Sequence, residues 1–270
     1  MIRLACATLS VEGFGETTFE KTFSALPGAG YRHVEFNCWY PSALSPAMIS
    51  SLKKRCDETG LKPAAIHLNS GLGGELIKDF SHKLWAMEAA SRLGAERIVT
   101  SGLDRSRAEG LAEAIASLKA LAPAAEGLGI LICLENHKDN ALENIEDYRR
   151  VFDAVASDNV GLCIDTGHFD AAGVDMDALI DEFAPRVNHI HLKENKGKGV
   201  KQFTRFGEGT TDNNHVIRRM VSLGYSGYLV IELSPEIGEG GDDSPLDKRP
   251  FTADDIALPY RLFSVYEDET

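Results

Sequence analysis

Short apolar runs rich in β-branched residues alternate along the chain with longer segments in which apolar residues recur at helical spacing. The short runs predict eight strands, at residues 2–8, 33–37, 62–68, 97–100, 130–135, 160–165, 187–193 and 228–233. The longer segments predict helices at residues 17–26, 46–59, 81–93, 105–128, 142–156, 177–183, 211–223 and 253–266. Because strands that alternate with helices favour parallel β–α units, the pattern indicates an α/β protein.

Turn and capping residues support these boundaries. Pro46 stands at the start of a predicted helix behind Ser45, a residue type that caps helix N-termini. Glycine stands where a left-handed conformation would end four of the helices, at Gly60, Gly94, Gly129 and Gly224. Eight β–α units in 270 residues predict a (β/α)8 TIM barrel that forms a single domain over residues 1–270, with a doubly wound open sheet as the alternative. The Gly-, Asp- and Pro-rich residues 235–249 predict a loop after the last strand, with a lid as one interpretation.

Charge and composition narrow the class of protein. The formal net charge is −13, which argues against a nucleic-acid partner because phosphates are bound by a basic surface. No apolar run approaches the roughly 20 residues that span a bilayer, so no membrane association is predicted. The five cysteines include no Cys-x-x-Cys pair, so we expect reduced cysteines in a cytoplasmic protein.

Polar residues end several predicted strands, and in a barrel the C-terminal strand ends form the active site. Glu135, Asp165, His191 and Glu232 end four strands that follow one another in sequence. Three carboxylates in one pocket repel each other unless a cation lies between them. Carboxylates with one imidazole suit Mn²⁺ or Mg²⁺, with Co²⁺ or Zn²⁺ as further candidates. The sequence therefore predicts one divalent metal ion per chain.

Other residues near the strand ends are candidates for substrate binding. His189 lies deeper in its strand than His191, so we expect it to be a packed core histidine. Lys193 could bind a substrate anion or stabilise negative charge, or it could simply pair with Glu194. The predicted substrate-binding residues are Glu35, Asn37, Trp39, His67, Asn136, His168, Lys193 and Arg205.

One stretch of this acidic chain is basic. It contains Lys196, Lys198, Lys201 and Arg205, and it leads into the glycine-bearing segment 205–212, which opens a predicted helix. Backbone amides at such a helix start can hold a phosphate, so a phosphorylated substrate is one interpretation. A solvated loop is the simpler one.

Four strings resemble a known superfamily. They are CLENH at 133–137, GLCIDTGHF at 161–169, HIHLKE at 189–194 and GYSGYLVIEL at 224–233, and together they resemble the xylose isomerase-like barrels. The resemblance implies that Glu135, Asp165, His191 and Glu232 bind the metal and that His168 contacts substrate. It also implies that Glu135 and Glu232 form the acid/base pair, on opposite faces of a bound ketose.

The expected activity is that of a metal-dependent sugar or sugar-phosphate isomerase or epimerase. Such an enzyme moves a proton next to a carbonyl through an enediolate that the metal stabilises. Ala141 stands where ketohexose 3-epimerases of this superfamily have a sugar-binding glutamate, which argues against a free ketohexose as substrate. An inosose-dehydratase-like lyase, acting on a keto-sugar or keto-polyol, is the first alternative.

Two further alternatives come from other classes. Residues 163–175 and 191–197 also resemble segments of endonuclease IV. However, Thr100 and residues 204–206 stand where that enzyme has ligands of its additional zinc ions. We therefore expect one metal ion and not three. A non-catalytic binding barrel is the last alternative. The expected partner is a small sugar-like molecule, and relatives suggest a homodimer or homotetramer.

Overall fold

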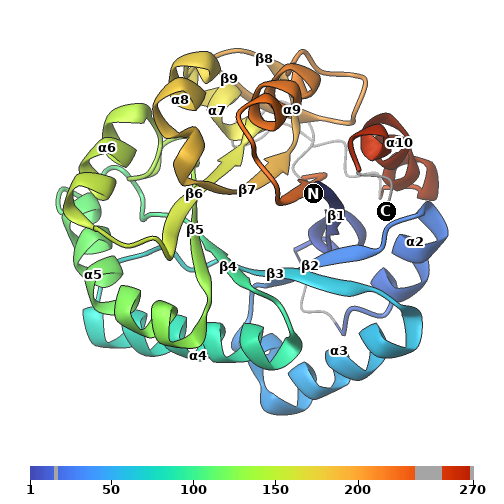
Figure 1. Cartoon of the computed structure of the whole chain (residues 1–270), viewed down its shortest axis with the longest axis horizontal. Helices are drawn as coiled ribbons and strands as arrows, with labels where there is room; N and C mark the ends of the chain where they lie inside the picture. Colours follow the sequence, from blue (N-terminus) through green and yellow to red (C-terminus); the bar gives the residue numbers. More distant parts are fainter. Residues whose placement is uncertain (15–17, 235–250, 268–270) are drawn as a thin grey trace.

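Eight parallel strands close into a barrel in the computed structural model, which describes residues 1–14, 18–234 and 251–267 (Figure 1). The neighbours around the barrel run β1-β10-β7-β6-β5-β4-β3-β2, so successive strands of the barrel pair with each other. The predicted TIM barrel is confirmed. Its strands are β1 (Arg3–Ala7), β2 (His33–Cys38), β3 (Lys62–Leu68), β4 (Arg97–Thr100), β5 (Leu131–Glu135), β6 (Val160–Asp165), β7 (Val187–Leu192) and β10 (Tyr228–Ile231).

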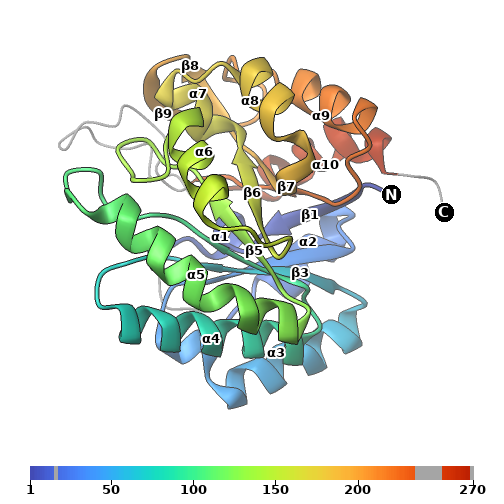
Figure 2. The same cartoon turned by 60° about the vertical axis from the view of Figure 1, so that its left-hand side comes forward.

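Helices surround the barrel on the outside (Figures 1 and 2). Within the described residues, none of them is both long and apolar enough to cross a membrane. The longer helices are α2 (Thr22–Ala29), α3 (Pro46–Thr59), α4 (Leu76–Leu93), α5 (Gly110–Leu128), α6 (Ile145–Ala154), α8 (Met176–Phe183), α9 (Asn213–Ser222) and α10 (Ala253–Phe263). The short ones are α1 (Leu9–Glu12), α7 (Thr166–Ala172), η1 (Pro41–Leu44), η2 (Ala184–Arg186) and η3 (Ser264–Tyr266).

The predicted caps form as expected around α3. The Ser45 hydroxyl accepts a hydrogen bond from the Met48 amide, and Gly60 ends the helix in the left-handed conformation. The helix predicted at 17–26 instead runs as α2 over Thr22–Ala29, with Pro27 inside it and Gly30 as the left-handed end. Its first predicted residue, like the loop predicted at 235–249, lies outside the described residues.

A two-stranded antiparallel hairpin replaces the solvated loop predicted after β7. It consists of β8 (Glu194–Gly197) and β9 (Val200–Thr204). Gly197 pairs with Val200, so Lys198 and Gly199 form the turn, and Gly199 has a φ of 84°. A glycine at the second position of a two-residue turn is a hairpin signal that the sequence contains.

The barrel interior explains how polar groups gather at one end. Side chains two residues apart on a strand share a face, so Cys133 lies below Glu135 and Cys163 lies below Asp165. These two cysteines pack in one buried cluster with Ala65 and Val99. The small and apolar residues fill the barrel beneath the carboxylates, and because all strands are parallel, every C-terminal end opens at the same mouth.

A buried ion pair ties helix α4 to the loop after β3. The Lys83 ammonium lies 2.6 Å from Asp79 Oδ1 and also donates to Ser70 Oγ and the Gly71 carbonyl. The other Asp79 oxygen accepts the Gly73 amide. Lys83 is fully buried, so its charge depends on these partners. The pair fixes the loop that follows His67 at the barrel mouth.

We therefore predict that Asp79→Ala destabilises the fold by about 3–5 kcal/mol, because it leaves a buried ammonium without its carboxylate. Urea unfolding measures this as a lower midpoint. The double variant Asp79→Leu/Lys83→Met removes both charges and should recover most of the loss. A double variant as unstable as Asp79→Ala would contradict the importance we give to the unpaired charge.

Candidate metal centre and active site

The four predicted metal ligands meet at the mouth of the barrel. Each offers a ligand atom, and these atoms all lie within 4.8 Å of one another. His191 Nδ1 lies 2.6 Å from Glu135 Oε1, 3.2 Å from Glu232 Oε2 and 3.9 Å from Asp165 Oδ2. All four side chains are buried. We call Glu135, Asp165, His191 and Glu232 the carboxylate cluster.

Lys193 lies against the carboxylate cluster. Its ammonium is 2.8 Å from Asp165 Oδ2 and 2.6 Å from Glu232 Oε1, and it also lies over the ring of Phe203. It does not pair with Glu194, the simpler interpretation considered from the sequence. Asp165 uses its other oxygen, Oδ1, to cap helix α7 by accepting the His168 amide. The start of α7 therefore fixes the orientation of this carboxylate.

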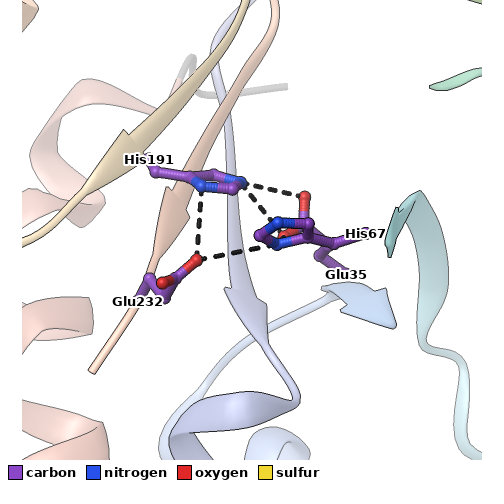
Figure 3. Close-up of side chains that lie close together, drawn as sticks. All are labelled: Glu35, His67, His191 and Glu232. Atoms are coloured by element: carbon purple, nitrogen blue, oxygen red, sulfur yellow. Dashed lines mark hydrogen bonds and ion pairs between the residues drawn. The ribbon is translucent and has the colours of Figure 1, made fainter. Parts of the chain in front are cut away.

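Glu35, His67 and His189 form a second layer beside the cluster. His189 Nε2 lies 2.7 Å from Glu35 Oε2, and His191 Nε2 lies 3.2 Å from the same oxygen. His67 Nε2 is 3.1 Å from Glu135 Oε2 (Figure 3 draws His67, Glu35, His191 and Glu232). His189 is fully buried, in agreement with the prediction of a packed histidine.

Buried carboxylates outnumber the positively charged side chains in this region. Burial raises the pKa of Asp165, and the neighbouring Glu135 and Glu232 raise it further despite Lys193. Burial works against a charge on His191, yet the surrounding Cys163, Glu35 and Glu135 raise the pKa of its imidazole well above the usual value. The two shifts share one contribution, because Glu135 raises the pKa of both Asp165 and His191.

An open cavity lies above the cluster. Its empty volume is about 710 Å³, which includes the space at its mouth that is open to solvent. Glu232, Lys193 and His67 reach it from the polar floor. Its other lining residues are Leu9, Phe14, Trp39, Leu68, Asn69, Ser101, His137, His168, Lys201, Phe203 and Ser234. Two ring nitrogens at this cavity, Trp39 Nε1 and His168 Nδ1, are buried and have no hydrogen-bond partner within the described residues.

His168 stays neutral at this position. Its burial, with His137 and Lys193 nearby, lowers the pKa of the imidazole well below the usual value. Its ring stacks on His137 with centroids 4.1 Å apart and packs edge-on against Phe203. A neutral, buried imidazole with an unused nitrogen can exchange a hydrogen bond with a hydroxyl group in the cavity.

Several predicted substrate-binding residues do not reach the cavity. Glu35 is fully buried beside His189 and His191. Asn37 accepts the Leu9 amide and contacts His67 Nδ1, and Asn136 accepts the Asp165 amide. Sequence alone could not separate these roles, because a residue at a strand end can face the cavity or its neighbours.

The basic stretch is not gathered at the site. Arg205 pairs with Asp255 of helix α10 and is not among the residues that line the cavity. The amides of Gly207 and Gly209, where a phosphate was considered, both donate to Glu194 Oε2. A carboxylate of the chain itself thus takes the position of the phosphate. Of this stretch, Lys201 lines the cavity.

Sequence reasoning missed His137. Its Nε2 lies 2.7 Å from Glu135 Oε2, and its side chain is partly exposed to the cavity. It stands two residues after Glu135, inside the CLENH string. The string itself pointed to this region. Because the strand ends at Glu135, however, the two-residue spacing did not predict that the Glu135 and His137 side chains would meet.

Comparison with known proteins supports this reading of the fold. The profile of the xylose isomerase-like TIM barrel family matches residues 23–248. An inosose dehydratase of Serratia proteamaculans is 26% identical over 256 residues, which cover 80% of this chain and 83% of the relative. The rhizopine catabolism protein MocC of Rhizobium meliloti is 25% identical, covering 81% and 75%.

Solved structures share the fold. An L-ribulose 3-epimerase superposes with a TM-score of 0.75 at 21% identity, covering 98% of this chain and 94% of the other. The IOLI protein with a bound zinc atom superposes with a TM-score of 0.74 at 20% identity, covering 97% and 96%. Dehydratases and epimerases are enzymes, in agreement with the prediction of an enzyme. On the match of its profile, the chain belongs to the xylose isomerase-like TIM barrel family.

Proposed function

We propose that the protein is a divalent-metal-dependent isomerase or epimerase that moves a proton next to the carbonyl of a small sugar-like ketone. The observation that carries the proposal is the carboxylate cluster, in which two glutamates converge on one imidazole at the floor of a polar cavity. Proton transfer of this kind needs two positioned acid/base groups and a means of stabilising negative charge on oxygen.

The residues present fit a divalent cation. Glu232 Oε2 is buried and accepts no hydrogen bond within the described residues, although it lies in the cluster. Glu135, Asp165, His191 and Glu232 would hold the ion. When bound, it would supply a Lewis acid that stabilises negative charge on neighbouring substrate oxygens. Three carboxylates and one imidazole favour Mn²⁺ or Mg²⁺, while the zinc-bound structural neighbour keeps Zn²⁺ a candidate.

The two glutamates would carry the proton. Glu232 lines the cavity and would take the proton from the carbon beside the carbonyl. Glu135 would return it, at the opposite face for an epimerase or at the neighbouring carbon for an isomerase. Glu135 contacts His137, and His137 lines the cavity. Lys193, which touches Glu232, would hold that carboxylate in place and stabilise a negative oxygen nearby.

The cavity favours a small polyhydroxylated substrate. Trp39 offers an apolar ring face and a buried indole N–H, and His168 offers a buried ring nitrogen; among the residues that the structure describes, neither nitrogen has a hydrogen-bond partner. Sugar rings combine apolar C–H faces with hydroxyl groups, so both features match one ligand. As further parts of this proposal, the protein binds no nucleic acid, assembles as a homodimer or homotetramer and acts in the cytoplasm.

A lyase is the second candidate. The curated relatives at 26% and 24% identity over about four-fifths of the chain are inosose dehydratases. Such an enzyme removes the same kind of proton but then expels a hydroxyl group instead of returning the proton to carbon. The first chemical step, and the residues proposed for it, are common to both candidates.

Metal content tests the carboxylate cluster first. We predict about one Mn²⁺ per chain by elemental mass spectrometry after equilibration and desalting, and no retained ion in Glu232→Ala, because that variant removes one of four ligands. Three zinc ions per chain would favour the nuclease alternative. A chain that holds no divalent ion would contradict the proposed metal centre.

The glutamate roles predict the next result. Glu135→Gln and Glu232→Gln should each slow exchange of substrate protons for deuterium by about 10²–10⁴-fold, because an amide cannot accept the proton. Proton NMR in D₂O measures the exchange on a panel of ketoses and keto-polyols. Glu182→Gln removes a carboxylate that pairs with Arg149 on the outer surface and serves as the control. Full exchange in either active-site variant would contradict its role.

The product separates the two candidate activities. For an isomerase or epimerase we predict an isomeric sugar that carries deuterium, because the proton returns to carbon. Mass spectrometry of the product distinguishes this from a dehydratase product, which is lighter by one water. Loss of water without isomer formation would replace the isomerase proposal by the lyase.

A further inference from the structure

His191 stands between two groups of carboxylates, and each of its ring nitrogens faces one of them. Nδ1 faces Glu135 at 2.6 Å and Glu232 at 3.2 Å. Nε2 faces Glu35, at 3.1 Å from Oε1 and 3.2 Å from Oε2. Figure 3 shows Glu232 and Glu35 on separate nitrogens of the same ring. The two nitrogen lone pairs of an imidazole diverge, so a cation bound at Nδ1 cannot also be bound at Nε2.

Glu35 does not reach the surface of the cavity. It is fully buried and is not among the residues that line the cavity. His189 holds it from below, with Nε2 at 2.7 Å from Glu35 Oε2. A carboxylate oxygen accepts, so at this distance the His189 Nε2–H donates to Glu35. Glu35 therefore accepts hydrogen bonds from two histidines of β7.

A second arrangement of ligands overlaps the first. Glu35, His67, His191 and Glu232 also bring one ligand atom each within 4.8 Å. In that set, the His67 nitrogen nearest Glu35 and Glu232 is Nδ1, at 3.4 Å and 3.8 Å. The Leu9 amide donates to Asn37 Oδ1, which turns the Asn37 amide nitrogen toward His67 Nδ1 at 3.2 Å. Asn37 thus lies at hydrogen-bond distance from the His67 nitrogen that this set would use, so a metal ion bound there would have to displace that contact.

We propose that Glu35 is a positioning residue that accepts the Nε2–H of His191 and so directs Nδ1 into the carboxylate cluster, without contacting metal or substrate itself. This inference rests on the metal site of the proposed function. A carboxylate behind a metal-binding histidine fixes the tautomer and the orientation of its ring, and loss of such a partner typically weakens metal binding by 10–100-fold. His189 completes the arrangement by holding Glu35.

Metal affinity tests this role independently of turnover. The free Mn²⁺ signal in electron paramagnetic resonance gives Kd for the unmodified chain and for Glu35→Ala, Glu35→Gln and Glu232→Ala. We expect Glu35→Ala to keep one site with a Kd weaker by about 10–100-fold. Glu35→Gln keeps an oxygen acceptor but loses the charge, and we expect it to fall between Glu35→Ala and the unmodified chain. The visible spectrum of bound Co²⁺ should change in Glu35→Ala, because a tilted imidazole alters the ligand field.

Glu194→Gln is the matched control. Glu194 also accepts two N–H groups with its carboxylate, from Gly207 and Gly209, but it touches no member of the carboxylate cluster. Its Kd for Mn²⁺ and its Co²⁺ spectrum should equal those of the unmodified chain. If Glu35→Ala does not fold by circular dichroism, Glu35→Gln decides the question with the same two measurements.

Two outcomes would overturn the inference while the metal site stands. Unchanged Mn²⁺ affinity and Co²⁺ spectrum in the Glu35 variants would show that Glu35 does not orient His191. Complete loss of binding in Glu35→Ala, with binding retained in Glu135→Ala and Asp165→Ala, would make Glu35 a ligand of the overlapping set. Absence of Mn²⁺ binding by the unmodified chain would overturn the metal centre of the proposed function together with this inference.

Discussion

Four buried carboxylates at one end of the barrel set the conditions that the rest of the site has to meet. Glu35, Glu135, Asp165 and Glu232 come from four different strands or strand ends, and none is exposed by more than 3%. Unpaired, each would pay a large desolvation penalty. The chain compensates with Lys193 and with imidazoles at hydrogen-bond distance, and it keeps the small and apolar side chains below. What remains is a site with more negative than positive charge, which is the setting in which proteins bind divalent cations.

The mouth of the barrel is organised in two levels. The lower level contains Glu35 and His189, which have no access to the cavity and act on the ring of His191. The upper level contains Trp39, His168 and Phe203, which surround the space above the carboxylates. Support of the His191 ring and the shape of the cavity are therefore assigned to different residues. Changes in the upper level can alter which ligand is accepted without disturbing the arrangement of the carboxylates.

This division bears on how one fold can serve both a dehydratase and an epimerase. A curated relative of this chain is named inosose dehydratase, and a solved structure with the same fold is named L-ribulose 3-epimerase. Removal of a proton beside a carbonyl starts either reaction, and the proposed function gives that step to the glutamates of the carboxylate cluster. In the proposed function, the fate of the resulting negative charge would depend on the side chains around the substrate, and Lys193, His137 and His168 line the cavity where it would bind.

The sequence by itself determined the barrel and the meeting of Glu135, Asp165, His191 and Glu232. Strand ends of parallel β–α units open at one mouth, so the position of each residue at a strand end was sufficient. Only the tertiary structure decided which neighbouring residues face the cavity and which support the ligands. Glu35 and Arg205 were expected at the substrate, yet Glu35 lies beneath His191 and Arg205 pairs with Asp255, while His137 was missed. These roles depend on side-chain direction and on partners distant in sequence, which a local pattern of hydrophobic and polar residues does not contain.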